Sequence, residues 1–203
     1  MDSYRTIQES TRAQLQRERS RFIAIATPIE NRNTVASLLQ AVEQEFSDAT
    51  HHCYAYRLIE KEQITEIVED AGEPLGSAGK PILQVLHGRD LVNTIVVVVR
   101  YFGGVKLGIG GLARAYSDAT KLVLDAVAVI ERIREIDLII KYPYSMTGEV
   151  MRTIHRFNVR MVKIEYSDMP QAWLRLAALH CDTFQSALRD ATRGQVELLE
   201  RML

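Results

Sequence analysis

The clearest pattern of apolar and polar residues lies in one segment near the middle of the chain. The run Thr94–Val99 (TIVVVV) is apolar without a break after its first residue, which is typical of a strand buried on both faces. Five of the eleven glycines then fall between Gly103 and Gly111, and apolar residues return at helical spacing from Leu112 to Ala126. The pattern predicts a strand, a glycine-rich loop and a helix in direct succession.

Upstream of this segment, the pattern predicts two extended segments followed by a helix. The extended segments lie within Thr11–Pro28, where Pro28 is expected to end the second. The helix then has apolar residues on one face between Val35 and Phe46, and Asn33 or Thr34 is expected to cap it.

Two strands, a structured loop and a second helix are predicted next. Residues 51–59 and 63–68 have the aromatic and β-branched content of strands. The segment Glu69–Leu83 holds three glycines and two prolines, which indicates a structured loop. Ser77 is expected to cap a helix that accepts Pro81 only in its first turn.

After residue 133 the pattern becomes six short elements in the order βαββαβ, the split βαβ arrangement of a ferredoxin-like domain. The elements are strands at 136–142, 159–166, 172–180 and 196–199, with helices from Pro143 or Ser145 to 157 and at 183–192. We therefore predict an α+β protein of two domains, residues 1–133 and 134–203.

Composition places the chain among ordinary globular proteins, with 47% apolar and 25% charged residues over 203 positions. No apolar run reaches the length of a membrane span, and the polar N-terminal segment lacks the apolar core of a signal peptide. The two cysteines, Cys53 and Cys181, lie far apart and favour reduced thiols over a disulfide or a zinc site. We expect a cytoplasmic protein with no membrane partner, and the sequence leaves the oligomeric state open.

The nearly balanced charge of the chain excludes general electrostatic binding to nucleic acid. The chain has 25 basic and 26 acidic residues, and the two predicted domains carry net charges of −2 and +1. Binding to a phosphate backbone therefore requires a local basic patch.

The glycine-rich loop is the main candidate for such a patch. Its backbone N–H groups at a helix N-terminus can meet an anion, flanking cations can hold phosphate, and two aromatic rings can stack on a base. The candidate residues are Arg100, Tyr101, Phe102, Gly103, Gly104, Lys106, Gly108, Gly110, Gly111 and Arg114. The alternative is that the glycines serve a tight connection with close backbone packing, and that Arg114 forms an i,i+4 ion pair with Asp118.

Two nucleotide-binding motifs are excluded by spacing. A P-loop needs a hydroxyl residue after its Gly-Lys pair, but Pro81 follows Gly79 and Lys80. A dinucleotide-binding loop needs a third glycine where this chain has Ala113.

A second group of candidates combines histidines with carboxylates. Asp48, His51 and His52, with Glu69, Asp70 and Glu73 downstream, could ligate a metal or activate water if the fold brought them together. Neighbouring residues on a strand face opposite sides, so one half-buried and one exposed histidine is the simpler interpretation. His51, His52, Glu73 and Lys80 are kept as secondary candidates. The sequence contains no complete catalytic constellation, cofactor motif or metal-ligand spacing, and Cys53 is expected to be a buried, inert thiol.

Several segments resemble the YigZ/IMPACT family, in the order in which they occur along the chain. These segments are Arg21-Phe22-Ile23-Ala24, Ala49 to Tyr56, Ala71-Gly72-Glu73-Pro74, Ser77 to Ile82, and Arg100-Tyr101-Phe102-Gly103-Gly104 through Tyr116. Where the family usually reads Asp-Asp-Gly-Glu-Pro, this chain has Ala71 in place of the second Asp.

The resemblance implies a first domain like the second domain of ribosomal protein S-five and a second domain like a late domain of elongation factor G. Both comparisons point to RNA or ribosome contact by analogy of fold. The eukaryotic IMPACT protein restrains a starvation-activated initiation-factor kinase through an additional N-terminal domain, and we do not expect that role here. The family offers no agreed catalytic residues.

Three hypotheses follow for function. The first is a non-enzymatic, translation-associated regulator that binds RNA or the ribosome through the glycine-rich loop. The second is a hydrolase or nucleotide-dependent enzyme that uses the region of His51, His52, Glu69, Asp70 and Glu73. The third is a regulator that binds a protein partner through the second domain.

Overall fold

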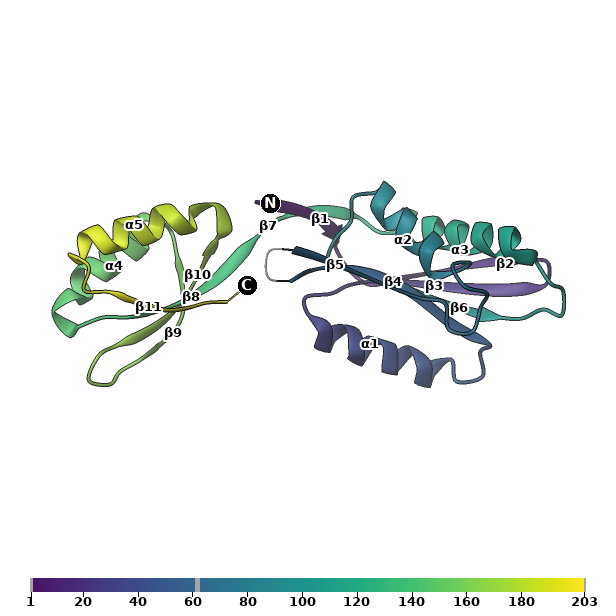
Figure 1. Cartoon of the computed structure of the whole chain (residues 1–203), viewed down its shortest axis with the longest axis horizontal. Helices are drawn as coiled ribbons and strands as arrows, with labels where there is room; N and C mark the ends of the chain where they lie inside the picture. Colours follow the sequence, from purple (N-terminus) through teal and green to yellow (C-terminus); the bar gives the residue numbers. More distant parts are fainter. Residues whose placement is uncertain (1, 61–62, 203) are drawn as a thin grey trace. The chain divides into compact units, whose positions relative to one another are not determined.

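The computed structural model describes residues 2–60 and 63–202, which divide into two compact units (Figure 1). The larger unit is Tyr4–Arg132, and the smaller unit combines Ile133–Leu203 with Met1–Ser3. Helices and strands are mixed in the chain, which confirms the α+β class at this coarse level.

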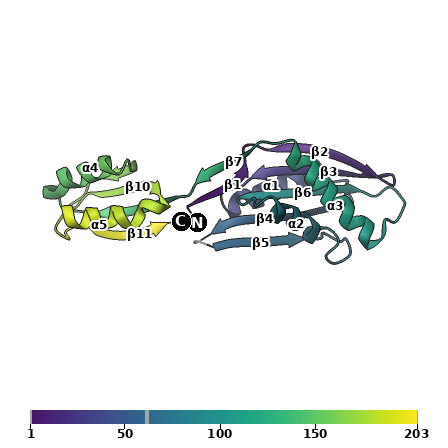
Figure 2. The same cartoon turned by 90° about the horizontal axis from the view of Figure 1, so that it is seen from above.

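The larger unit is built on an antiparallel five-stranded sheet in the order β2-β3-β6-β4-β5. These strands are β2 (Thr11–Arg17), β3 (Ser20–Pro28), β4 (His51–Glu60), β5 (Gln63–Glu69) and β6 (Thr94–Tyr101). Helix α1 (Arg32–Glu45) covers one face, and helices α2 (Gly79–Gly88) and α3 (Gly108–Asp125) cover the other (Figures 1 and 2). The strands, the loop and the helix predicted around residue 100 are all present.

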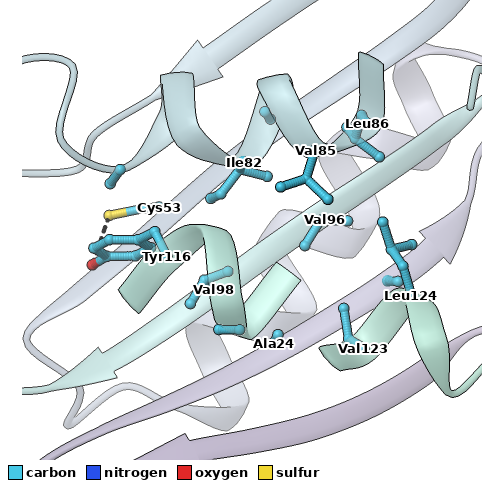
Figure 3. Close-up of a cluster of buried hydrophobic side chains, with 14 of the residues drawn as sticks. Ala24, Cys53, Ile82, Val85, Leu86, Val96, Val98, Tyr116, Val123 and Leu124 are labelled. Atoms are coloured by element: carbon cyan, nitrogen blue, oxygen red, sulfur yellow. Dashed lines mark hydrogen bonds between the residues drawn. The ribbon is translucent and has the colours of Figure 1, made fainter. Parts of the chain in front are cut away.

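Strand β6 lies at the centre of the sheet, which explains its unbroken apolar run. Ile95, Val97 and Val99 pack into the core under α1, whereas Val96 and Val98 pack against α2 and α3. Both faces of this strand are buried, so no position calls for a polar side chain. The core between the sheet and α2 and α3 is drawn in Figure 3.

The predicted helix caps are wrong in both cases. Helix α1 begins after Asn31, whose side-chain oxygen accepts the backbone N–H of Thr34 at 2.9 Å. At α2 the Ser77 hydroxyl is fully buried and has no hydrogen-bond partner among residues 2–60 and 63–202. The carboxylate of Asp70 caps this helix from outside, since it accepts the N–H groups of Ala78 at 3.0 Å and Gly79 at 2.9 Å.

The smaller unit has the predicted βαββαβ order, and its sheet runs β11-β8-β10-β9 with every neighbouring pair antiparallel. Its elements are β8 (Glu135–Lys141), α4 (Thr147–Arg156), β9 (Arg160–Glu165), β10 (Gln171–Ala177), α5 (Cys181–Ala191) and β11 (Glu197–Met202), with short 3-10 turns at Tyr144–Met146 and Ala178–His180. One core joins α4 and α5 to the sheet, with Leu138, Leu174 and Phe184 buried in it.

Two short strands were not predicted from the sequence. β1 (Ser3–Ile7) and β7 (Val129–Ile133) pair as a two-stranded ribbon. Within residues 2–60 and 63–202, no helix is both long and apolar enough to cross a lipid bilayer.

Candidate nucleic-acid interface

The glycines of the loop between β6 and α3 have different structural roles. A Cβ atom added to Gly103 would lie 2.1 Å from the backbone carbon of Arg19, so this glycine allows two chain segments to touch. Gly104 and Gly108 have φ values of +83° and +68°, in the left-handed region that favours glycine. These three positions support the packing interpretation of the loop.

The remaining glycines, Gly110 and Gly111, form the first turn of α3. This helix has no side-chain hydrogen bond at its N-cap residue, Leu107, and no acidic residue in its first turn. Its first N–H groups therefore have no capping partner within the helix, and they carry the positive end of an 18-residue helix.

A surface cleft of about 420 Å³ opens beside this turn. Three cations line it, Arg17 from the end of β2 and Lys106 and Arg114 from the loop and helix, together with the acids Glu18 and Asp118. Arg17 pairs with Asp118 at 3.0 Å. Among the described residues, Lys106, Arg114 and Glu18 have no ion-pair partner within 4.0 Å, so the three cations and two acids leave the cleft with a net charge of +1.

The predicted ion pair between Arg114 and Asp118 is not present. The Asp118 carboxylate turns instead to Arg17, and it lies 3.8 Å from Lys121. The Arg114 guanidinium extends back along α3, because its Nη1 lies 3.8 Å from the place where a Gly110 Cβ would be. A cation thus lies over the positive end of a helix, where an anion would be stabilised.

The prediction that Arg100 binds an anion at the surface is wrong, because this residue is buried and has a structural role. It is 4% exposed, and its Nη1 donates to Glu73 Oε1 at 2.6 Å. Its Nη2 lies 3.3 Å from the hydroxyl of Ser20, which also accepts the N–H of Gly103 at 3.2 Å. Arg100 therefore fastens the glycine-rich loop to two other segments and cannot reach a phosphate outside the protein.

The buried network continues from Glu73 into α3. The Tyr116 hydroxyl donates to Glu73 Oε1 at 2.8 Å. It also lies 3.3 Å from the Cys53 thiol, a contact drawn in Figure 3. Burial raises the pKa of Cys53 to about 12, and burial also raises the pKa of Tyr116. Both groups stay protonated at neutral pH, as expected for an inert thiol and a structural phenol.

The two aromatic rings that follow Arg100 differ in exposure. Tyr101 packs against the core under α1, its hydroxyl donates to Asp48 at 2.7 Å, and the Arg21 guanidinium lies over its ring. Phe102 is 47% exposed, and the Cζ of Arg100 lies 5.4 Å from its ring centroid. Phe102 is therefore the ring that presents a stacking surface.

The fold brings together only part of the histidine and acid group, His51 and Glu73. His51 Nδ1 donates to the carbonyl of Ala71 at 2.8 Å, and its Nε2 lies 3.9 Å from Glu73 Oε1. His52 faces the other side of the sheet and bonds the carbonyl of Phe46 at 3.0 Å. Of the pair, the fold brings only His51 to a carboxylate, and that oxygen already accepts from Arg100 and Tyr116.

The other members of this group have local tasks. Asp70 caps α2, and Glu69 accepts the N–H of Ala71 at 2.9 Å. Lys80 is exposed beside Gly76 in the first turn of α2. Among the described residues, no group of three or more His, Cys, Asp or Glu side chains is placed to hold a metal ion.

Two residues of this region escaped the sequence analysis. Arg17 contributes to the cleft from a strand far from the loop in sequence, and Ser20 joins Arg100 to Gly103. No local pattern marks either residue, although Ser20 directly precedes the Arg21 to Ala24 segment that carries part of the resemblance.

Comparison with known proteins decides the family. The model of the Impact N-terminal domain matches residues 18–124, which is more than half of the chain. The chain belongs to the IMPACT family. It is 30% identical over 200 residues to IMPACT family member YvyE of Bacillus subtilis, covering 98% of this chain and 92% of that protein. It is 27% identical over 183 residues to IMPACT family member YigZ of Escherichia coli, covering 90% of each.

A solved structure described as that of a hypothetical protein is similar over both units of this IMPACT family chain. It superposes with a TM-score of 0.75 at 26% identity and covers 98% of this chain and 97% of that one. Three of the segments that carried the resemblance meet in the buried network: His51 and Cys53 come from Ala49–Tyr56, Glu73 from Ala71–Pro74, and Arg100 and Tyr116 are the two ends of the last segment. These segments therefore form one physical unit beneath the glycine-rich loop.

Proposed function

We propose that this IMPACT family protein is a non-enzymatic, translation-associated protein that binds RNA through the cleft beside the first turn of α3. The carrying observation is that Lys106 and Arg114, neither of which has an ion-pair partner among the described residues, lie beside a helix N-terminus whose N-cap residue makes no side-chain hydrogen bond. Like charges held together in this way cost stability, and a bound phosphate group offsets that cost.

RNA fits this site better than a small anion because the candidate groups are spread along a loop and across two elements. Arg17 and Lys106 line the cleft from different segments, and the exposed Phe102 directly follows β6, four residues before Lys106 in the sequence. A backbone of repeating phosphates can meet several cations at once, and an aromatic ring beside them suits a base. Ribosomal RNA in the cytoplasm is the source that this proposal favours.

The proposed folds of the units agree with such a role. The four-stranded βαββαβ unit is proposed to be ferredoxin-like and related to a late domain of elongation factor G, and the larger unit to resemble the second domain of ribosomal protein S-five. This argument rests on analogy of fold and supports the class of partner, while the cleft supplies the chemistry.

The test is binding of a fluorescein-labelled structured RNA, measured by anisotropy at several salt concentrations, with co-sedimentation on ribosomes. The variant Lys106→Gln/Arg114→Gln should bind at least about tenfold more weakly and lower the salt slope by about 1.5, since each lost phosphate contact removes roughly 0.7–0.9. Lys121→Gln is the matched control, because it removes one charge from the same helix about 20 Å beyond its first residue. Equal affinity of the double variant and the native protein would exclude the cleft as the RNA site.

The hypothesis that the protein is a hydrolase is tested by substituting Glu73. If Glu73 served as an acid or base, Glu73→Gln would abolish a hydrolytic activity in a variant that keeps its fold. The geometry instead favours a structural tie, because Glu73 already accepts hydrogen bonds from Arg100 and Tyr116.

A further inference from the structure

Phe102 has an environment that is unusual for an exposed aromatic residue. Its backbone N–H lies 3.2 Å from the Thr50 hydroxyl, and the next residue, Gly103, is packed against the backbone of Arg19 and Ser20. The ring therefore extends from a backbone that is held on both sides. With 47% of the residue exposed, it cannot be explained as a core side chain.

The support beneath the ring is a buried cation. The Arg100 Cζ lies 5.4 Å from the Phe102 centroid and 5.4 Å from that of Phe22, so the guanidinium contacts one exposed and one buried ring. Arg100 is fixed in turn by Glu73 and Ser20. An aromatic ring with a fixed cation on one side and solvent on the other is a preformed stacking surface that loses little conformational entropy on binding.

We infer that the RNA recognised by this site contains an unpaired nucleotide, whose base stacks on Phe102 while a nearby phosphate binds at Lys106 and Arg114. This inference rests on the proposed RNA-binding function and specifies its ligand class. In a continuous A-form duplex the bases are stacked on one another and the deep groove is too narrow for side chains, so a ring like Phe102 has no base face to meet. Loops, bulges and free ends present such a face.

The experiment compares two labelled RNAs of equal length and charge, a hairpin with an open apical loop and a fully paired duplex. Native protein should bind the hairpin about fivefold or more tightly, since one base stacked on an aromatic residue contributes at least that factor. Phe102→Leu should reduce hairpin affinity to the duplex level and leave duplex affinity unchanged, and Phe102→Trp should retain the preference. Ile109→Ala is the matched control, because Ile109 is 66% exposed in the same region and has no ring.

A fluorescent base reports stacking directly. 2-Aminopurine in the hairpin loop should lose fluorescence when native protein binds and keep it when Phe102→Leu binds. Equal affinity for hairpin and duplex, or equal weakening of both by Phe102→Leu, would overturn the inference even if Lys106→Gln/Arg114→Gln weakened both RNAs and so upheld the proposed function. Absence of binding to either RNA would overturn both.

Discussion

Arg100 and Lys106 lie close together in the sequence, yet the fold gives their charges opposite surroundings. The Arg100 guanidinium is enclosed with the Glu73 carboxylate, so its charge is used inside the protein. Lys106 is exposed at the cleft and has no ion-pair partner among the described residues. The buried pair fixes the loop, and the exposed cation remains free for a ligand.

The buried pair gives the first prediction. Glu73→Gln should lower the free energy of unfolding of the larger unit by about 3–5 kcal/mol, because it leaves the Arg100 charge buried without a counter-ion. Urea unfolding followed by circular dichroism measures the change. Arg12→Gln is the control, since the Arg12–Glu45 pair is exposed and should contribute no resolvable amount. Similar losses from both variants would contradict the structural role assigned to Glu73.

Two glycines of the same loop give the second prediction. Gly103→Ala should destabilise the larger unit by at least about 1–3 kcal/mol, because its Cβ would overlap the backbone of Arg19. Gly110→Ala should be neutral or stabilising by up to about 1 kcal/mol, since its Cβ would meet only Arg114 Nη1 at 3.8 Å in a helical turn. Thermal unfolding of both variants tests this contrast, and an equal effect would remove the distinction between packing and helix-forming glycines.

Helix α2 shows how an element can depend on a side chain outside it. Its N-terminus is capped by Asp70 from the end of β5, and the same carboxylate also accepts the N–H of Gly76 at 2.7 Å. Burial alone raises the pKa of Asp70, but the three backbone donors outweigh it and the pKa lies below its ordinary value of 3.8. The loop between β5 and α2 is thereby held in a closed turn beneath the glycine-rich loop.

The third prediction separates this cap from the one expected from the sequence. Asp70→Ala should cost about 1–2 kcal/mol of stability, whereas Ser77→Ala should cost little because the Ser77 hydroxyl has no hydrogen-bond partner in the described part of the chain. The lowered pKa means that the Asp70 contribution is complete above pH 3.8 and is lost as pH falls through the folded-state value. The stability difference between native protein and Asp70→Ala should therefore shrink at acid pH. A difference that stays constant down to pH 2 would contradict this assignment.

At the scale of the whole molecule, the two units have separate sheets and separate cores. Cys53, Glu73 and Arg100 belong to the larger unit, and the single tryptophan, Trp173, belongs to the smaller one on β10. The fluorescence of Trp173 therefore reports on the smaller unit. Substitutions in one core can be made without changing a residue of the other.

The fourth prediction uses this arrangement. Leu174→Ala, which removes a fully buried side chain from β10, should lower the stability of the smaller unit by about 2–5 kcal/mol and shift the Trp173 fluorescence transition in urea. Glu73→Gln should leave the Trp173 fluorescence transition unchanged. It should move the unfolding transition of the larger unit, followed by circular dichroism, to a lower urea concentration. One common transition that both variants move equally would show that the units unfold together.

The sequence by itself determined the order and type of most elements, because hydrophobic periodicity is a local property that follows from burial on one or two faces. It predicted the strand at Thr94–Val99, which extends to Tyr101, the helix with apolar residues from Leu112, which begins at Gly108, and the βαββαβ order of the second half. It also identified the segments that mark the IMPACT family. The role of each charged residue lay beyond such patterns.

Only the tertiary structure decided which charges are buried, paired or free. Glu73 meets Arg100 across 27 positions and Arg17 meets Asp118 across 101, so neither contact leaves a periodic trace in the sequence. The same is true of Asp70, which replaces Ser77 as the cap of α2 because the strand end lies beside the helix. Desolvation and pairing depend on the three-dimensional surroundings of a group, and these arise when distant segments pack together.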